Sequence, residues 1–491
     1  MVAVLIVGCG GGGSSGASSG EPAVDPTFRI AIREIDDLDD YVGEATVVGT
    51  QMSENLTHID EQSGEVRPWL AEEIPTSSDG GLTWAITLRT GVTWHDGTPM
   101  DAASVVASFR RVLSNLATEQ SGLMGGRNIA TVTQTGARTL QVILKKPDPI
   151  FPRLMSIFKV QKAVDDPAKP VGTGPYRFVS WSRGQSVELT RNDSYWGQKP
   201  QVKDVQFKII PDAGARLSAL LAGEVDFVTN LQPEDGRRVP NFIDAPSVKH
   251  PFLVLDQSSG PTADQRVRQA LNYATDKEAI KEQLLGGFGD VESCQALGAT
   301  DVGFNDTLKA YPFDPDRARS MIKEAGFEGA TIDVLGIQGR WLKDREIIEA
   351  VAQMWRDVGL QVEINYPSAF DRWLAAAQNR SDRPGAYYTS GNLYERDAAG
   401  LDSYLEMGSP VSSVFDEGLS TQFLEASRVS DPAQRQQALA TSMATVCEQA
   451  PFVFAVSPHD LYGATEAVSV VPPKYGETYL RVQDVKMTAT S

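Results

Sequence analysis

The side chains that most often carry out catalysis are spread along this chain without the spacing of a known catalytic motif. None of the histidines belongs to an HExxH zinc motif or lies four residues from another; they are His58, His95, His250 and His459. The chain contains neither the G-x-S-x-G turn of serine hydrolases nor a phosphate-binding P-loop. His95 and Asp96 are neighbours, and neighbouring side chains on a strand point to opposite faces. We therefore expect a protein that has no catalytic chemistry and needs no cofactor.

The sequence also argues against both a nucleotide site and a metal site. Residues 8–13 match the dinucleotide-binding G-x-G-x-x-G pattern, yet no complete strand precedes them and no helix follows. The cysteines Cys9, Cys294 and Cys447 have neither C-x-x-C spacing nor the spacing of zinc ligands. A bare metal site needs clustered histidine or carboxylate ligands, so we expect no metal site. Cys294 and Cys447 either form a disulfide in an oxidising compartment or stay as buried thiols, and the sequence leaves both open.

Composition and charge are those of a folded globular protein with an acidic surface. The chain has 491 residues, 41% of them hydrophobic and 22% charged, a length that suggests about three domains. Outside the N-terminus, no run approaches the roughly 18 apolar residues that a membrane-spanning helix needs. With 45 Lys and Arg against 64 Asp and Glu, the formal net charge is −19. Such a surface repels phosphate backbones, so nucleic acid is not an expected partner.

The start of the chain carries the pattern of a lipid-attachment signal. Residues 5–20 read LIVGCGGGGSSGASSG, an aliphatic run followed by a cysteine and a glycine/serine tract. Bacterial signal peptides of this type are cut before the cysteine, whose sulfur then carries lipid, and the tract is a flexible tether. The alternative, a first β-strand, would lead straight into a structureless string. Because no Lys/Arg region precedes the short apolar run, we expect a truncated or misassigned start.

Cys9 is therefore the expected lipidation site. The body of the protein is then extracytoplasmic, either anchored to the outer face of the cell membrane or periplasmic. Its contact with the membrane is through the lipid anchor alone.

Strand and helix patterns alternate along the rest of the chain. Residues 28–32 are expected to be a strand, and 83–94 a strand pair that turns at Thr90-Gly91. Apolar residues at helical spacing predict helices over 101–114, 264–287, 314–327 and 345–358. Such alternation indicates sheets covered by helices on two faces, which is an α/β fold.

Four of these segments, taken in order, resemble the signature blocks of one family. They are LTWAITLRTGVTWHDGTPMDAASVVASFRRVL (82–113), GTGPYRFVSW (172–181), VRQALNYATDKEAI (267–280) and YPFDPDRARSMIKEAGF (311–327). The family is family 5 of extracytoplasmic solute-binding proteins, the peptide/nickel-binding family of ABC importers. The resemblance implies two periplasmic-binding-protein-like lobes joined by a hinge, with an additional domain inserted in the N-terminal lobe. It also implies a monomer that passes its ligand to ABC transporter permease subunits.

This resemblance divides the chain into six stretches. Residues 1–27 hold the signal-peptide remnant, the lipobox and the tether. Lobe I is expected in 28–60 and 166–252 with a return in 456–491, the inserted domain in 61–165, and lobe II in 253–455.

The resemblance also suggests how the ligand is held. Peptide-binding members hold the free amine of the peptide with an aspartate, and the aligned position here is Ser390. The peptide amine therefore lacks its usual partner unless Glu395 or Asp397 replaces it. A family arginine that takes a carboxylate matches Arg340, whose planar guanidinium makes two charge-assisted hydrogen bonds. The alternative for Arg340 is a solvent-exposed loop residue.

Aromatic and amide side chains complete the expected pocket. Besides Arg340 and Ser390, the ligand candidates are Trp341, Tyr388, Asn392, Tyr394, Ser53 and Asn55. Tyr387 lies nearby, and Trp373 lies in a helical pattern that suits a core residue equally well. We expect a lipoprotein that captures a small solute, an oligopeptide or peptide-like compound, between two lobes. The alternatives are a non-peptide solute (oligosaccharide, opine-like conjugate or metal chelate) and a non-transport scaffold of the cell envelope.

Overall fold

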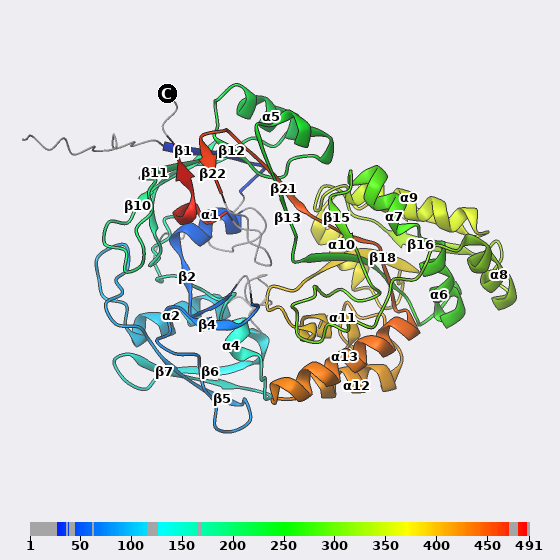
Figure 1. Ribbon diagram of the computed structural model, residues 1–491. Helices are drawn as coiled ribbons and strands as arrows, with labels where there is room; N and C mark the ends of the chain where they lie inside the picture. The colour runs from blue at the N-terminus through cyan, green and yellow to red at the C-terminus, as the bar shows by residue number, and fades with distance from the viewer. Residues whose placement is uncertain are drawn as a thin grey trace, which may run out of the picture.

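The computed structural model shows two α/β lobes that face each other and are joined by chain crossings (Figure 1). It describes residues 27–35, 38, 45–60, 63–114, 126–164, 166, 168–470 and 480–488. Within these residues the N-terminal lobe, lobe I, holds a seven-stranded sheet, and a three-stranded sheet lies beside it. The C-terminal lobe, lobe II, holds a five-stranded sheet. This arrangement confirms the predicted two-lobe α/β fold.

The sheet of lobe I is built around β1 (Thr27–Ile32), which confirms the strand expected over 28–32. β1 runs parallel to both of its neighbours. The strand order is β13 (Asn241–Ala245), β21 (Asp460–Ala464), β12 (Phe227–Val228), β1, β11 (Asp204–Ile209), β10 (Ser186–Arg191) and β9 (Tyr176–Ser182). Alternate β1 residues face opposite sides, so Ile30 packs with helix α1 (Ala45–Met52) and Ala31 with helix α5 (Ala213–Leu221).

The inserted domain has its own antiparallel sheet and core. Its strands are β5 (Thr83–Thr87), β7 (Thr139–Leu144) and β6 (Ile129–Gln134), in that order. The expected helix is α2 (Ala102–Leu113), and the side chain of Asp101 caps it by accepting the Ser104 N–H at 2.8 Å. Trp94 and Phe109 are buried in the core beneath it.

The strand pair expected over 83–94 is wrong in its second half. Only 83–87 form a strand, and that strand pairs with β7, more than fifty residues further along the chain. The local turn does exist, since Gly91 has a φ of +77°. β7, however, presents buried Leu140, Val142 and Leu144 at every second position. That apolar face matches the buried face of β5, so the distant strand replaces the local one.

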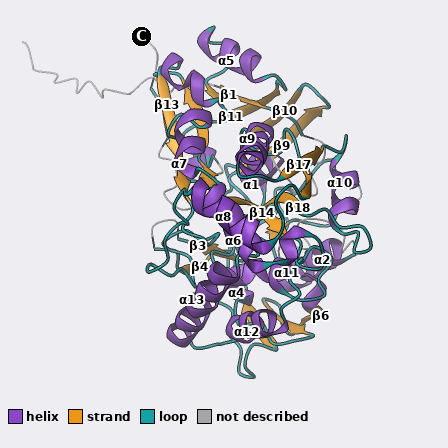
Figure 2. Cartoon of the chain, turned by 90° about the vertical axis from the view of Figure 1, so that its right-hand side faces the viewer, coloured by secondary structure: helices purple, strands orange, loops and turns teal. Residues whose placement is uncertain are grey.

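Lobe II is covered by helices on its outer side (Figure 2). Its strand order is β17 (Gln361–Asn365), β16 (Thr331–Leu335), β18 (Ala386–Asn392), β14 (Lys249–Leu255) and β19 (Phe452–Phe454). The main helices are α6 (Gln265–Ala274), α8 (Pro315–Ala325), α9 (Asp344–Asp357), α10 (Phe370–Ala377), α12 (Glu417–Ser427) and α13 (Pro432–Gln449). Shorter elements there are α7 (Lys277–Ala279), α11 (Asp402–Leu405), β15 (Gly289–Val291) and β20 (Val456–Pro458).

The single helix expected over 264–287 is divided in the structure. α6 ends at Ala274, and the next residue, Thr275, has the extended backbone angles φ −90° and ψ 111°. The side chain of Asp276 then caps a new short helix by accepting the Ala279 N–H at 2.9 Å. The apolar spacing continues across the break, which explains why periodicity alone predicts one helix.

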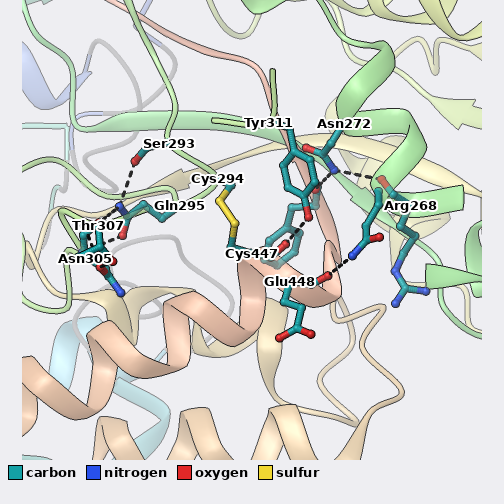
Figure 3. Close-up of a disulfide and its surroundings, with 12 residues drawn as sticks. Arg268, Asn272, Ser293, Cys294, Gln295, Asn305, Thr307, Tyr311, Cys447 and Glu448 are labelled. Carbon is teal, nitrogen blue, oxygen red and sulfur yellow. Dashed lines mark hydrogen bonds between the residues drawn. A yellow bond between two sulfur atoms is a disulfide. The ribbon is translucent and has the colours of Figure 1, made fainter. Parts of the chain in front are cut away.

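Cys294 and Cys447 are joined by a disulfide, which decides between the two alternatives that the sequence left open. The bond links the segment after β15 to the end of α13, with a Cα–Cα distance of 5.4 Å (Figure 3). Next to it, the Tyr311 hydroxyl donates to the Cys447 carbonyl at 2.7 Å. The bond closes a loop across a sequence separation of 153 residues, and long loops gain the most from such a closure in the chain-entropy account.

We expect reduction of this disulfide to destabilise lobe II. Loss of a bond of this kind removes about 2–5 kcal/mol of unfolding free energy, so the unfolding midpoint should fall by roughly 5–15 °C. The measurement is a thermal melt of the wild type and of a Cys294→Ser/Cys447→Ser double variant, each with and without dithiothreitol. The reductant should lower only the wild-type midpoint, and an equal response of both proteins would contradict the assignment.

In the part of the chain that the structure describes, two short crossings connect the lobes. One runs through residues 246–248, between β13 in lobe I and β14 in lobe II; the other is His459, between β20 and β21. β13 and β21 pair as antiparallel neighbours, so the crossings lie side by side (Figure 1). Both lie within a few residues of the lobe limits expected at 252 and 456, and we propose that they form the hinge.

Charged side chains tie these crossings together. The two ring nitrogens of His459 lie 2.6 Å from Oδ1 of Asp244 and 3.2 Å from Oδ2 of Asp290. Asp244 belongs to β13 of lobe I and Asp290 to β15 of lobe II, so the imidazole bridges the lobes. Lys249 pairs with Asp460 across the crossings at 3.1 Å. Burial lowers the pKa of His459, but the hydrogen bonds and charges of the two carboxylates outweigh burial and raise this pKa to about 9.

We expect the bridge to make stability depend on pH in the alkaline range. The pKa of His459 is raised above its ordinary value of 6.5, so its contribution is complete below about pH 6.5. That contribution is lost as pH rises through about 9. The measurement is the difference in unfolding midpoint between the wild type and His459→Gln from pH 6 to pH 10 at constant ionic strength. The difference should shrink towards pH 10, and a constant difference would show that no proton is involved.

Candidate functional site

A recess lies between the lobes and takes its walls from both of them. We call it the interlobe recess; it encloses about 890 Å³ of empty space, part of it open to solvent. Lobe I and the inserted domain supply β2 (Glu54–Asn55), β3 (Thr57–Ile59) and β8 (Lys159–Val160). Lobe II supplies Tyr394 and Arg396. The further lining residues are Thr50, Gln51, Ser53, Trp69, Ser156, Pro175, Tyr195, Arg481 and Gln483.

A buried carboxylate, Glu54, organises one wall of this recess. Oε1 accepts hydrogen bonds from Trp69 Nε1 at 2.7 Å and from the Tyr195 hydroxyl at 2.8 Å. Oε2 accepts from the Thr173 hydroxyl at 2.8 Å and from Trp196 Nε1 at 2.9 Å. Burial raises the pKa of Glu54, and these four donors act in the opposite direction. A carboxylate has about four acceptor positions, so Glu54 is fully occupied.

A second wall of the recess, around His58, carries positive charge, whereas the Glu54 wall carries a carboxylate. Burial, together with the positive charges of Arg481 and Lys159, lowers the pKa of His58 to about 4. His58 is therefore a neutral imidazole at pH 7. Its ring lies 5.5 Å from that of Trp69, and the Arg481 guanidinium lies 5.5 Å from the same indole. This side of the recess thus combines an aromatic wall with cationic groups.

Lobe II closes the recess with a strained and tightly held segment. Arg396 has a φ of +55°, a conformation that residues other than glycine adopt at an energetic cost. Its guanidinium pairs with the buried Asp301 and donates to the Thr300 hydroxyl at 2.6 Å. Arg153 from α4 (Phe151–Leu154) of the inserted domain donates to the carbonyl of Glu395 at 3.2 Å. The structure is therefore closed here, with direct contacts between the two sides.

A second recess lies beside the crossings. This hinge recess, with about 1250 Å³ of empty space, is lined from lobe I, from both crossings and from residues 338–346 of lobe II. Arg340 lies on its wall, with its guanidinium 4.2 Å from the Phe370 ring and 5.5 Å from the Trp341 ring. Asp344 holds this loop, because its carboxylate accepts the backbone N–H groups of residues 339–341. Arg33 of lobe I donates to the Gly339 carbonyl at 2.5 Å, which closes this side as well.

The expected ligand residues divide between the two recesses, and some of them are buried behind the walls. Ser53, Asn55 and Tyr394 meet in the interlobe recess, whereas Arg340 and Trp341 meet in the hinge recess. Tyr388 is only 1% exposed and lies behind Trp341, with the ring centroids 5.8 Å apart. Ser390 is 6% exposed, and its buried hydroxyl has no hydrogen-bond partner in the described residues. The side chain of Asn392, and Cys9 with the whole tether, lie outside the described part of the chain.

Neither expected replacement for the amine-binding aspartate is available. Asp397 is fully buried, accepts two hydrogen bonds from Arg435 at 2.7 and 2.9 Å, and also caps the Ala399 N–H. Glu395 is buried against Gly400, and burial raises its pKa well above the usual range. Trp373 and Tyr387 are buried in the core of lobe II, as the helical pattern around Trp373 allows.

Several lining residues were not predicted from the sequence. Glu54 stands between the two candidates Ser53 and Asn55, but one glutamate in a polar stretch carries no signal of its four donors. Lys159 reaches the site because β8 pairs with β2, which aligns Lys159 with Asn55. Arg481 arrives from the far end of the chain. Only tertiary structure could bring these residues together.

Comparison with known proteins identifies the family. The profile of the bacterial extracellular solute-binding proteins, family 5, matches residues 65–402. The chain belongs to this family. It is 31% identical over 340 residues to the dipeptide-binding protein of Escherichia coli K12, covering 61% of this chain and 63% of that protein. It is also 31% identical over 287 residues to the nickel-binding periplasmic protein of the same strain, covering 54% of each.

A solved relative supports the fold over nearly the whole chain. NikA from Brucella suis, crystallised with Fe(III)-EDTA, superposes with a TM-score of 0.83 at 22% identity, covering 94% of this chain and all of that one. The relatives named here are binding proteins rather than enzymes, in agreement with the absence of a catalytic motif in the sequence. The described part of the chain has no helix long and apolar enough to cross a membrane.

We expect the Glu54 cluster to stabilise the protein strongly. Glu54→Ala leaves two indoles and two hydroxyls without their acceptor, and each buried unsatisfied donor costs about 1–3 kcal/mol. The free energy of unfolding should fall by at least about 3 kcal/mol, measured by urea denaturation. Glu65→Ala is the control, because Glu65 forms an exposed ion pair with Arg67 and should matter little. Equal effects of the two variants would contradict a central role for Glu54.

Proposed function

We propose that this protein captures a small solute, a short peptide or a peptide-like compound, and delivers it to the permease of an ABC importer. The observation that carries the proposal is the interlobe recess, whose walls come from both lobes. The family assignment and the dipeptide-binding relative support it. The burial of Glu395 and the pairing of Asp397 with Arg435 keep a non-peptide solute as the second candidate.

The closed arrangement is suited to this task. A solute between the lobes is fully contacted only when they close, so its binding energy shifts the balance towards the closed form. Contacts from Arg153 to Glu395 and from Arg33 to Gly339 join the two sides in this arrangement. A permease that recognises this form would then distinguish loaded from empty protein.

Among the expected ligand residues, those that line a recess are the strongest candidates. We propose that Ser53, Asn55 and Tyr394 contact the solute directly in the interlobe recess, and that Arg340 and Trp341 do so in the hinge recess. Tyr388 and Ser390 would act from behind, by shaping the wall on which Trp341 rests. We also propose Asn392 as a contact, at the end of β18.

We further propose that Cys9 carries a lipid and that the protein works as a tethered monomer outside the cytoplasm. The sequence around Cys9, an aliphatic run followed by a glycine/serine tract, supports this. In cells, Cys9→Ser should move the protein from the membrane fraction to the soluble fraction. A variant that stays with the membrane would show that the lipid is not what holds it.

Arg340 provides a direct test of the solute. We expect solutes from a panel of peptides, oligosaccharides, opine-like conjugates and metal chelates to raise the unfolding midpoint and to reduce the radius of gyration in X-ray scattering. Arg340→Ala should weaken a carboxylate-bearing ligand by about 1.5–3 kcal/mol, the range for a hydrogen bond to a charged group. Arg319→Ala, a substitution in an exposed ion pair on α8, is the control.

The outcomes separate the candidates. Unchanged affinity in Arg340→Ala would remove Arg340 from the site. If no compound produces a shift or a compaction, the result favours the cell-envelope scaffold over transport.

A further inference from the structure

The charges that line the interlobe recess are unequal, and this bears on the solute. Of the described residues that line it, three carry cationic side chains: Lys159, Arg396 and Arg481. One, Glu54, carries a carboxylate. The depressed pKa of His58 supports a positive field here, since Arg481 and Lys159 both lower it while Asp60 has a smaller opposite effect.

The one lining carboxylate cannot bind an ammonium group. Glu54 already accepts four hydrogen bonds at 2.7–2.9 Å, from two indole N–H groups and two hydroxyls. A carboxylate offers about four acceptor positions, so a ligand amine would have to displace a buried donor. That displaced donor would then be unsatisfied in a buried site, which is unfavourable.

Two carboxylates behind the wall are also occupied. Asp301 binds the Arg396 guanidinium through Oδ1 and accepts the Gly298 N–H at 2.7 Å through Oδ2. Asp397 is bound to Arg435. Among the described residues, a free amine entering this recess would therefore meet cations and no available acid.

The cationic side, in contrast, is reachable. The Arg481 side chain is 32% exposed, and the carboxylate that it pairs with in the described residues, on the exposed Asp484, is 3.7 Å away. That distance is longer than a charge-assisted hydrogen bond, so a ligand anion can compete for the guanidinium. Next to Arg481 stand the neutral His58 and the face of Trp69, which suit a flat, planar acid.

We propose that the interlobe recess binds a carboxylate of the solute, with Arg481 as a specificity-determining residue, and that the group bound there carries no free amine. The proposal rests on the proposed function and names the chemistry of its solute. A peptide that enters this recess does so by an acidic or N-blocked end. Opine-like conjugates and carboxylate chelates satisfy the same requirement.

Matched compounds test this directly. The protein without its first 20 residues is titrated with trialanine, N-acetyl-trialanine, trialanine amide, an opine-like dicarboxylate and its diamide, and the affinity is measured by calorimetry. Carboxylate compounds should bind whether or not the amine is blocked, and amidation should weaken binding about tenfold or more. Arg481→Gln should cause a similar loss, Arg481→Lys should restore much of it, and the exposed control Arg266→Gln should have no effect.

Each outcome bears on a separate claim. Tight binding that needs a free amine and survives amidation would overturn this inference and leave solute binding intact. Full carboxylate affinity in Arg481→Gln would also overturn it, because the anion would then be held elsewhere. Neither binding nor compaction with any compound would overturn the proposed function itself.

Discussion

Every contact that a solute makes with both lobes depends on two short crossings of the chain. β13 and β21 are paired strands of the lobe I sheet, and each continues into lobe II within a few residues. Antiparallel pairing keeps the crossings side by side, so the two connections stay together if the lobes change their angle. Charged contacts add to this pairing at the crossings. Lys249 pairs with Asp460, and His459 bridges Asp244 and Asp290. If these crossings are the proposed hinge, a small part of the molecule guides closure.

The interior of the site is governed by a second constraint, the cost of burying a carboxylate. Glu54 has no cation beside it among its hydrogen-bond partners; it is satisfied by Trp69 from the inserted domain and by Thr173, Tyr195 and Trp196 from lobe I. A buried charge needs such donors. Because the donors to Glu54 come from both the inserted domain and lobe I, their hydrogen bonds hold these two parts together. The same arrangement uses up the acceptors of Glu54. The character of the recess is then determined by its remaining polar groups, which are neutral or cationic.

Much of the fold was predictable because its signals are local. The strand at 28–32 and the helix capped by Asp101 follow from periodicity and capping over a few residues. The prediction of a strand pair over 83–94 was wrong because β5 pairs with β7, which lies far along the chain. The apolar face of β7 matches the buried face of β5. The helix expected over 264–287 was broken by the cap at Asp276, a local preference that periodicity does not register. The pairing of Cys294 with Cys447 also needed the fold, since their separation in sequence gives no measure of their distance in space.

By itself, the sequence determined the α/β class, the two-lobe family fold and the segments that contain Ser53, Asn55, Arg340 and Tyr394, since each of these signals lies in a contiguous stretch of chain. Only the tertiary structure decided which of these residues share a recess, and that Arg340 and Tyr394 belong to different ones. It also decided the charge of the site, because Glu54, Lys159 and Arg481 come from three distant parts of the chain. The availability of a carboxylate or a guanidinium depends on the partners that folding places beside it, and no spacing in the sequence records those partners.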